Sequence, residues 1–553
     1  MDSTVTHIKR RWTLVALCVI GCAAQALRAG ATPSNPYTYV HHAVSTDVPA
    51  AQFAFDRGLT LVFAYEGDEA ERAFREAARL DPSLAMAWWG IALAVGPNIN
   101  YPPELKATGI GAASMERAKV LAEKRATVDE RRYIEALSSR YSSDEKPDYD
   151  KLAIAYREAM RGLVQAHPND ADAAALYAEA IMDLHPWRLW SNDGKPGPDT
   201  PELVELLESG LKRNPTHIGL LHYYIHAVEA SADPGRALNV AHRLAMLPME
   251  PAENHLVHMP AHIYLRVGDW APAIEANEHS LHHAFDYRVA DNPKAEPTCG
   301  HYGAFITYAY MMVGNELRSR QSALDCKGIS SDPTRALSVL LRFHAWDDVL
   351  SFPKPTPDLN EYGKHGHAVT GFWHFSRGLA FRAQGRLDRA QNELEALQTE
   401  AALLPAPPDS HGTLDLEHSI ENLWTVSNRG AMGLATAILR ARLAEARGQL
   451  AEATELLRDA VQIQDGMPYG EPPGWFYPVR ESLGALLLKR GDIADAETAF
   501  REGVRLSPHD PRMLLGLSEA RSAAGHATDA VAARREFMAL WQGAEGEPKV
   551  ADF

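Results

Sequence analysis

Apolar residues recur at helical spacing along nearly the whole of this chain, and the alternation that is typical of strands is almost absent. Alanine-rich segments are broken at short intervals by Gly, Asp-Pro or Asn-Pro, which begin or end helices. Short connections of this kind place successive helices antiparallel to one another. The chain has 553 residues, too many for one ordinary globular domain. We therefore predict an all-α fold made of several domains or of a repeat array.

Small and aromatic residues recur with a regular spacing in this helical background. The first unit has Gly58, Ala70, Phe74, Ala77 and Pro82. The small residues let two antiparallel helices approach closely, the aromatic ring fills the gap between hairpins, and the proline ends the second helix. Further units have Gly268 and Ala273; Gly385 and Ala390; Gly448, Ala453, Leu457 and Ala460; Gly491, Ala496, Phe500 and Pro508; and Gly525 and Ala530. The pattern resembles the tetratricopeptide repeat (TPR) family. This resemblance implies a right-handed superhelix, or solenoid, of roughly twelve helical hairpins over most of residues 50–541.

Three longer segments interrupt the repeats, at residues 186–201, 351–367 and 404–428. Loops of this length inside a compact array are more often functional or mobile than neutral spacers. The last segment is rich in proline at its start, so we place a boundary there. The predicted organisation is an irregular superhelix with a His-rich groove over residues 32–404, a linker over 405–428, a regular array over 429–541 and a tail over 542–553.

The first 31 residues have the order of a secretory signal. Three basic residues at 9–11 precede an uncharged, mostly apolar run of sixteen residues at 12–27, and small residues follow. We expect cleavage after Ala31 and a mature protein in the periplasm or outside the cell. The run is shorter than a membrane span, which needs eighteen or more residues. The residues before Cys22 resemble a bacterial lipobox, so a lipid anchor at Cys22 is the alternative.

The charge of the chain bears on its partners. The formal net charge is −17, and residues 1–31 carry four basic residues and one acidic residue, so cleavage leaves −20. Phosphate binding needs a basic stripe, which the sequence does not contain, and we expect no nucleic-acid partner. The predicted mature chain keeps Cys299 and Cys326. They form either one disulfide in an oxidising compartment or two separate buried thiols.

Four histidines form two pairs whose spacing is repeated. His222 and His226 are four residues apart, as are His258 and His262, and the second pair follows the first by 36 residues. This interval is about one helical-hairpin repeat. A separation of four stacks two imidazoles on one helix face, a turn apart. Bidentate metal binding or a paired proton relay requires this arrangement.

The TPR resemblance also implies which of these side chains face the groove. In that family, positions 2, 5, 9, 12 and 13 of each hairpin's first helix point into the concave groove. Setting the register by the small residues Ala237, Ala273 and Gly314 places six histidines at such positions: His222, His226, His255, His258, His262 and His301. Glu179 takes groove position 9 of an earlier hairpin, from which its carboxylate can complete a ligand set. His374 falls outside the groove positions and is interpreted as a packing residue.

A histidine cluster in phase with the repeats predicts a bound transition metal. Neutral imidazoles are the commonest metal ligands, and a cluster of this size would repel itself if it were protonated. Imidazoles with or without a carboxylate suit Zn, Cu(II) or Fe(II) and discriminate poorly among them. On the same helices, the candidate ligand-binding residues are Glu229, Arg266, Tyr302 and Tyr308. The tyrosines equally suit packing between hairpins, and Arg266 can bind a carboxylate of a ligand.

Three segments, 258–268, 299–302 and 473–480, resemble those of large exported bacterial TPR proteins. This resemblance implies a fold but does not indicate a reaction. The sequence lacks a phosphate-binding glycine loop, a Gly-x-Ser-x-Gly elbow and a His-Glu-x-x-His motif. The first interpretation is therefore an exported TPR-repeat binding protein whose groove holds a transition metal and a peptide, protein or small molecule. The alternatives are a metal-free TPR scaffold that binds a peptide or partner protein, and a metalloenzyme that acts on a small exported substrate.

Overall fold

The structure is a computed structural model of the chain. It describes residues 40–250, 253–291, 300–324, 333–356, 366–406, 414–543 and 546–553. The predicted signal peptide of residues 1–31, with Cys22, lies outside the described residues. Cys299 and Cys326, and with them the question of a disulfide, lie outside them as well.

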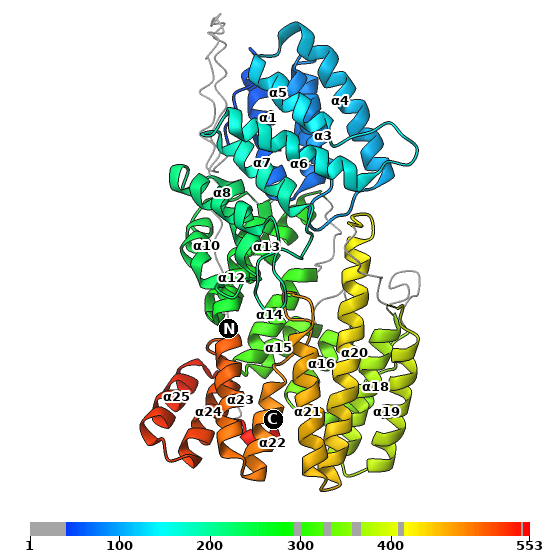
Figure 1. The fold of residues 1–553 in the computed structure, drawn as a ribbon, viewed down its shortest axis with the longest axis vertical. Helices are drawn as coiled ribbons and strands as arrows, with labels where there is room; N and C mark the ends of the chain where they lie inside the picture. Colours follow the sequence, from blue (N-terminus) through cyan, green and yellow to red (C-terminus); the bar gives the residue numbers. More distant parts are fainter. Residues whose placement is uncertain are drawn as a thin grey trace, which may run out of the picture. The chain divides into compact units, whose positions relative to one another are not determined.

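Helices make up nearly all the regular structure of the described residues (Figure 1). They are α1 (Pro49–Phe63), α2 (Gly67–Leu80), α3 (Ala85–Ala94), α4 (Leu105–Arg125), α5 (Val128–Ser138), α6 (Tyr149–Ala166), α7 (Ala171–Met182), α8 (Thr200–Arg213), α9 (Ile218–Val228), α10 (Leu238–Ala245), α11 (Asn254–His258), α12 (Pro260–Val267), α13 (Trp270–Asp291), α14 (Gly300–Met312), α15 (Glu316–Leu324), α16 (Pro333–Arg342), α17 (Trp346–Ser351), α18 (Gly366–Ala383), α19 (Leu387–Ala402), α20 (Ser419–Ala446), α21 (Leu450–Asp465), α22 (Arg480–Arg490), α23 (Ile493–Leu506), α24 (Pro511–Ala523) and α25 (Ala527–Leu540). Two short 3₁₀ helices, Pro234–Ala237 and Val550–Asp552, and two isolated bridges accompany them. The prediction of an all-α fold is confirmed.

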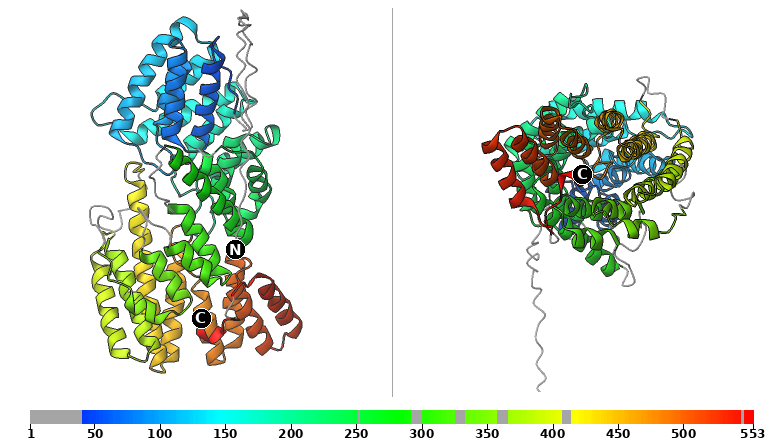
Figure 2. Two further views of the ribbon diagram at one scale, coloured as in Figure 1. Left: turned by 180° about the vertical axis from the view of Figure 1, so that it is seen from behind. Right: turned by 90° about the horizontal axis from the view of Figure 1, so that it is seen from below.

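Successive helices pack side by side as antiparallel pairs. The pairs α1–α2, α18–α19, α20–α21 and α24–α25 show this clearly in both the front and the rear view (Figures 1 and 2). Their buried apolar side chains belong to one continuous core that extends from Val40 to Phe553. The predicted superhelix of TPR-like hairpins is thus confirmed.

Close contacts between a phenylalanine and two glycines hold neighbouring hairpins together. Phe74 of α2 lies between Gly58 of α1 and Gly90 of α3, and a Cβ atom at Gly58 would lie 2.8 Å from the ring. A Cβ atom at Gly90 would lie closer still. In the last hairpins Phe500 has the same relation to Gly484 and Gly516. The spacing of Gly58 and Phe74 therefore has the packing role that the repeat pattern predicts.

The breaks between helices have local causes. In the Asp-Pro step before α24, Asp510 accepts hydrogen bonds from the backbone N–H groups of Arg512 and Met513, and Pro511 occupies the first turn. Gly268 ends α12 with a φ of 73°, a left-handed conformation that favours glycine. Pro260 has no N–H to donate, and the helical segment is divided there into α11 and α12.

The linker predicted over residues 405–428 is shorter in the structure. Helix α20 begins at Ser419, so residues 419–428 are helical. The prolines of this region are confined to its start, and Ile420, Leu423 and Trp424 have helical spacing, which explains the difference. The predicted tail also folds back, because Val550 and Phe553 are buried in the core.

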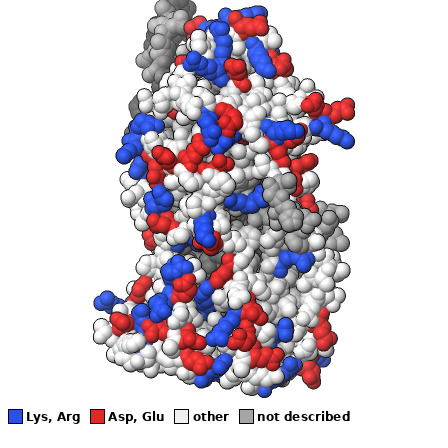
Figure 3. Space-filling model, in the orientation of Figure 1, with Lys and Arg blue, Asp and Glu red and all other residues white. Residues whose placement is uncertain are grey.

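Charge on the surface is mixed. On the face drawn in Figure 3, Lys and Arg side chains lie among Asp and Glu side chains over most of the described elements. Among the described residues, no helix combines the length and the apolar character that crossing a membrane requires.

Candidate metal centre

The six predicted histidines come together in the interior of the helical array. His222 and His226 lie on α9, His255 and His258 on α11, His262 on α12 and His301 on α14. They form two groups, and within each group the three ligand nitrogens lie within 4.8 Å of one another. We call His222, His226 and His255 the first triad, and His258, His262 and His301 the second triad.

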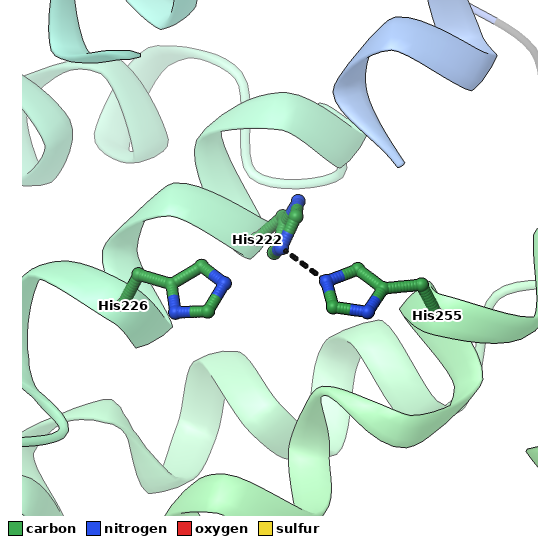
Figure 4. Close-up of side chains that lie close together, drawn as sticks. All are labelled: His222, His226 and His255. Atoms are coloured by element: carbon green, nitrogen blue, oxygen red, sulfur yellow. Dashed lines mark hydrogen bonds between the residues drawn. The ribbon is translucent and has the colours of Figure 1, made fainter. Parts of the chain in front are cut away.

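In the first triad, imidazoles from α9 and α11 point toward one another (Figure 4). His222 Nε2 and His255 Nε2 are 3.2 Å apart. His222 Nδ1 lies 2.6 Å from the carbonyl oxygen of Phe63, and His226 Nδ1 lies 2.8 Å from Glu229 Oε1. His226 Nε2 is buried and has no hydrogen-bond partner among the described residues. Both histidines of α9 therefore have an acceptor at Nδ1 and an Nε2 that is available to the triad.

In the second triad, His258 Nε2 and His262 Nε2 are 2.8 Å apart. His258 Nδ1 lies 2.6 Å from Asn277 Oδ1. The amide of Asn277 donates from Nδ2 to the carbonyl oxygen of Ala273, which orients its oxygen toward His258. His301 lies with its ring centroid 4.8 Å from that of His258 and is the exposed member of the triad.

Two buried carboxylates contact the second triad and connect it to the first. Glu229 Oε2 lies 2.5 Å and Glu471 Oε2 lies 2.8 Å from His262 Nδ1. Glu229 and Glu471 are each 2% exposed at the side chain. Because the other oxygen of Glu229 contacts His226, this one carboxylate joins a histidine of each triad. Glu229, His262 and Glu471 also form a third group with the spacing of metal ligands.

The partners at Nδ1 determine where the lone pairs of the imidazoles point. An amide oxygen and an ionised carboxylate only accept hydrogen bonds, so His258 Nδ1 carries hydrogen. The two carboxylates beside His262 Nδ1 favour hydrogen there as well, although neither makes an aligned hydrogen bond with it. In the neutral tautomers the two Nε2 atoms then present lone pairs to each other at 2.8 Å. This contact needs a proton or a metal ion between the nitrogens. Two imidazoles bound to one tetrahedral ion at 2.0–2.1 Å have nitrogens about 3.3 Å apart. The observed separations of 2.8 and 3.2 Å are close to this value.

Burial and mutual repulsion keep most of these imidazoles neutral. Burial lowers the pKa of His222, His255 and His258, and neighbouring histidines lower it further. Burial also lowers the pKa of His262, but Glu229 and Glu471 outweigh this effect and raise it to about 10. Burial raises the pKa of Glu229, but His262 and His226 outweigh it and hold it well below its usual range. Without a metal, His262 therefore carries an additional proton, and this proton lies between Nε2 of His258 and Nε2 of His262, where a metal cation can bind instead.

Tyr65 is a component of the site that the sequence did not reveal. It follows α1 and has a φ of 57°, which is unusual for an aromatic residue. Its ring packs on His222 at 4.7 Å, on His226 at 5.9 Å and on His255 at 5.8 Å between centroids. The first hairpin thus reaches α9 and covers one side of the first triad.

Two loops far apart in sequence cover the centre. In the loop between α7 and α8, the ring of Trp187 meets His226 edge-on at 5.8 Å. In the loop between α21 and α22, the hydroxyl of Tyr469 lies 3.4 Å from Glu229 Oε2. Asn192 Nδ2 of the first loop donates to the carbonyl oxygen of Gly466 in the second, at 2.7 Å. These loops cover part of the cluster, in which four of the six histidines are buried, His255 is partly buried and His301 is exposed.

Two pockets lie beside the loop that carries Glu471. One, of about 240 Å³, is lined by Arg266, Tyr308, Tyr469 and Glu471 among others. The second, of about 610 Å³, is lined by Tyr308 and by the aromatic residues of the same loop, and it includes Ala304, one turn from His301. Both pockets are therefore next to ligand-bearing segments of the centre.

The other predicted site residues have different roles. Arg266 donates to the carbonyl oxygens of Glu229 and Ser231 and lines the smaller pocket. Tyr302 donates to Asn254 Oδ1 at 2.5 Å and packs on His258. Tyr308 is buried and lines both pockets.

Glu179 belongs to none of the three groups with metal-ligand spacing. It lies near the buried pair of Arg140 and Asp183, whose atoms Nη2 and Oδ2 are 2.7 Å apart. Burial raises the pKa of Glu179 to about 7, although Arg140 opposes the shift.

Comparisons with known proteins find only distant structural similarities. No protein-family model matches the sequence, and no curated protein matches it either. Among solved structures, a human IFIT1 dimer with m7Gppp-AAAA has a TM-score of 0.32 and 11% sequence identity, covering 90% of this chain and 91% of that chain. Yeast Tom70 has a TM-score of 0.27 and 9% identity, covering 89% and 92%. Similarities at this level carry no argument about function.

Proposed function

We propose that this chain is an exported helical-repeat protein that binds a transition metal through its buried histidine cluster. The observation that carries the proposal is the orientation of the imidazoles. Acceptors hold the Nδ1 atoms of His222, His226 and His258, carboxylate oxygens lie beside Nδ1 of His262, and Nε2 atoms meet at 2.8 and 3.2 Å. Metal-binding histidines characteristically have such acceptors at their second nitrogen.

The ligand set limits the kind of metal. Neutral imidazoles suit Zn, Cu and Fe. The carboxylates of Glu229 and Glu471 offset part of the positive charge of a buried ion. The structure therefore supports a histidine-bound divalent ion over a calcium or magnesium site, which would need more oxygen ligands.

Elemental analysis tests this proposal directly. The protein is purified without a His-tag and without added metal, and its zinc, copper and iron contents are measured. We expect a tightly held ion that survives dialysis, and we expect the variant His258→Ala/His262→Ala to lose metal. The loss follows because the variant lacks two of the three imidazoles of the second triad.

His374→Ala is the matched control. His374 of α18 forms a hydrogen bond, 2.6 Å long, with Glu393 of the paired helix α19, and it lies outside the cluster. This variant should keep its metal. Retention of all metal by the double variant, or a metal-free wild-type protein that also fails to bind added ions, would contradict the proposal. A metal-free TPR scaffold that binds a peptide or partner protein would then remain.

A second candidate function is catalysis by the bound metal on a small substrate. The pocket of about 240 Å³ favours it, because Glu471 lines the pocket and also contacts His262. An ion held by three imidazoles keeps an open position for water or substrate. Addition of azide to the Co(II)-loaded protein should change the visible spectrum if this position is open. An unchanged spectrum would indicate a closed, structural site.

Export is proposed from the sequence of residues 1–31 alone. The mature protein should be recovered outside the cytoplasm with Thr32 at its N-terminus, as amino-terminal sequencing would show. A lipid-modified N-terminus at Cys22 would instead support the lipobox alternative. Recovery of the uncleaved chain in the cytoplasm would contradict export without affecting the proposal about metal.

A further inference from the structure

We infer that the cluster holds two metal ions, one in each triad. This inference rests on the proposed function, because it assumes that the histidines bind metal. It adds the number of ions and divides the ligands between them. The single-ion prediction from the sequence had all the imidazoles converge on one point.

The two triads have the same construction. Each has a pair of histidines at i and i+4, His222 with His226 and His258 with His262. Each pair is completed by a histidine from another helix, which is His255 on α11 for the first and His301 on α14 for the second. Three imidazoles are a sufficient protein ligand set for a tetrahedral ion with one open position. The cluster therefore contains two complete sets.

The ligand nitrogens, rather than the ring centres, define the two sets. Within each triad the three ligand nitrogens lie within 4.8 Å of one another, and the close Nε2 contacts are 3.2 Å for His222 and His255 and 2.8 Å for His258 and His262. The ring centroids do not separate the triads, because those of His226 and His255 are 6.2 Å apart within the first triad and those of His226 and His262 are 5.7 Å apart between the triads. Two nitrogens bound to one ion at 2.0–2.1 Å lie at most about 4.2 Å apart, so six imidazoles that fall into two groups of ligand spacing do not fit around one ion. A single ion would leave three buried imidazoles without a metal.

The carboxylates fit a pair of neighbouring ions. Glu229 contacts the Nδ1 atoms of His226 and His262, so it orients one ligand of each triad. Two divalent ions bring four positive charges, and Glu229 and Glu471 offset two of them. The remaining charge favours a small anion, such as hydroxide or a carboxylate, at the open positions. The class of exogenous ligand for this centre is therefore a small anion.

A competing arrangement places one ion among Glu229, His262 Nδ1 and Glu471, the third group. That ion would replace the Nδ1 proton of His262, whose Nε2–H would then donate to His258 Nε2. It would also use neither His255 nor His301. The two arrangements therefore make different predictions for variants of those two residues.

Counting Co(II) ions bound to triad-specific variants tests the inference. His255 and His301 are the least buried members of their triads, so replacing them disturbs the fold least. Metal-free protein is prepared, loaded with Co(II) and dialysed against a weak chelator. This is done for the wild type, His255→Asn, His301→Asn, the double variant of these two residues, and His374→Ala. Metal per chain is then measured by elemental analysis. Circular dichroism confirms that each variant is folded.

We expect two ions in the wild type and in His374→Ala, one in each single variant and none in the double variant. The one-ion variants should show different visible spectra, because different triads hold the remaining ion. A wild type that saturates with one ion, or a single variant that keeps two, would overturn the inference. One histidine-dependent ion would still support the proposed function, whereas a protein that binds no Co(II) and no Zn(II) would contradict both.

Discussion

Glu229 Oε2 lies 2.5 Å from His262 Nδ1, while Oε1 of the same carboxylate lies 2.8 Å from His226 Nδ1. One buried side chain thus fixes a histidine on α9 and a histidine on α12. It sets the ring orientation of both, and it belongs to the last turn of the helix that carries His226. The geometry of both triads therefore depends on a residue that need not touch a metal itself.

Glu229→Gln should weaken metal binding without abolishing it. Loss of an acceptor at Nδ1 lowers metal affinity by about 10–100-fold, and here it should affect both triads. In the metal-free protein it also removes one of the two carboxylates beside the His262 imidazolium and leaves Glu471 alone there, at a cost of about 1–3 kcal/mol of stability. Competition with a chromophoric chelator and urea unfolding measure the two effects. Glu393→Gln, which changes a partly buried histidine–glutamate contact outside the cluster, at His374, should leave metal affinity unchanged.

Glu471→Gln should have a smaller effect than Glu229→Gln. Burial raises the pKa of Glu471, so its ionised form contributes less, and it contacts only one of the two triads. We expect metal to be retained, with an affinity loss of about tenfold or less. Elemental analysis of the variant would show this. Complete loss of one ion would instead identify Glu471 as a direct ligand.

Tyr65→Phe should leave metal content unchanged and should not reduce stability. The hydroxyl of Tyr65 is buried and has no hydrogen-bond partner among the described residues. Removing an unsatisfied buried hydroxyl stabilises a protein by about 1 kcal/mol. Urea unfolding and elemental analysis check both expectations. A lower metal affinity in this variant would place the phenol oxygen at the ion or at its exogenous ligand.

His42→Ala should destabilise the protein in a pH-dependent way. His42 Nδ1 lies 2.8 Å from Asp172 Oδ2. Burial lowers the pKa of His42, but Asp172, Asp170 and Asp56 outweigh it and raise it above 6.5. Burial raises the pKa of Asp172, but His217 and His42 outweigh it and lower it to about 2. The contact is therefore charged on both sides at pH 4–6.5.

The stability difference between wild type and His42→Ala should accordingly be largest, about 1–2 kcal/mol, near pH 5. The difference should shrink as the pH rises above 6.5, because His42 then loses its proton. It should also shrink as the pH falls from 3.8 toward 2, because Asp172 then gains a proton. Urea unfolding across this range measures it. His41→Ala is the neighbouring control, because that side chain is 68% exposed and should contribute little. A difference that does not vary with pH would contradict this prediction.

Gly90→Ala should destabilise the protein by about 1–3 kcal/mol, because the new methyl group would overlap the ring of Phe74. Gly162 of α6 is the matched control: it is also helical, and an added Cβ would meet no atom within 4 Å. Gly162→Ala should stabilise by up to about 1 kcal/mol through helix propensity. Thermal unfolding compares the two. Equal effects would show that the contact between Phe74 and its glycines does not hold the hairpins together.

The sequence could predict the repeat and the clustering of the histidines. Gly58 and Phe74 indicated the packing of hairpins because their contact is local and recurs. His222 and His258 could be placed in equivalent helices because the repeat length relates them. The division into two triads could not be predicted, because it depends on how far each helix rotates and on the break at Pro260.

The partners of the histidines could not be predicted either, because they come from distant parts of the chain. Glu471 lies about 200 residues beyond His262, and nothing in its Pro-rich loop indicates where that loop packs. Tyr65 reaches His222 only because α1 packs against α9. Glu179 was predicted from its register as a ligand, but register does not include the attraction of Arg140, which lies on another hairpin.

The hydrogen bond from Asn192 to Gly466 has a consequence for biosynthesis. A nascent chain that has been translated as far as His301 already carries all six imidazoles, but it still lacks Glu471, Tyr469 and the second of the two covering loops. Until the ribosome has completed the following hairpins, any ion acquired by the nascent chain is open to exchange with competing chelators. If the cluster binds metal as proposed, the covered site is complete only in the finished polypeptide, after the segment with Tyr469 and Glu471 has been synthesised and has docked.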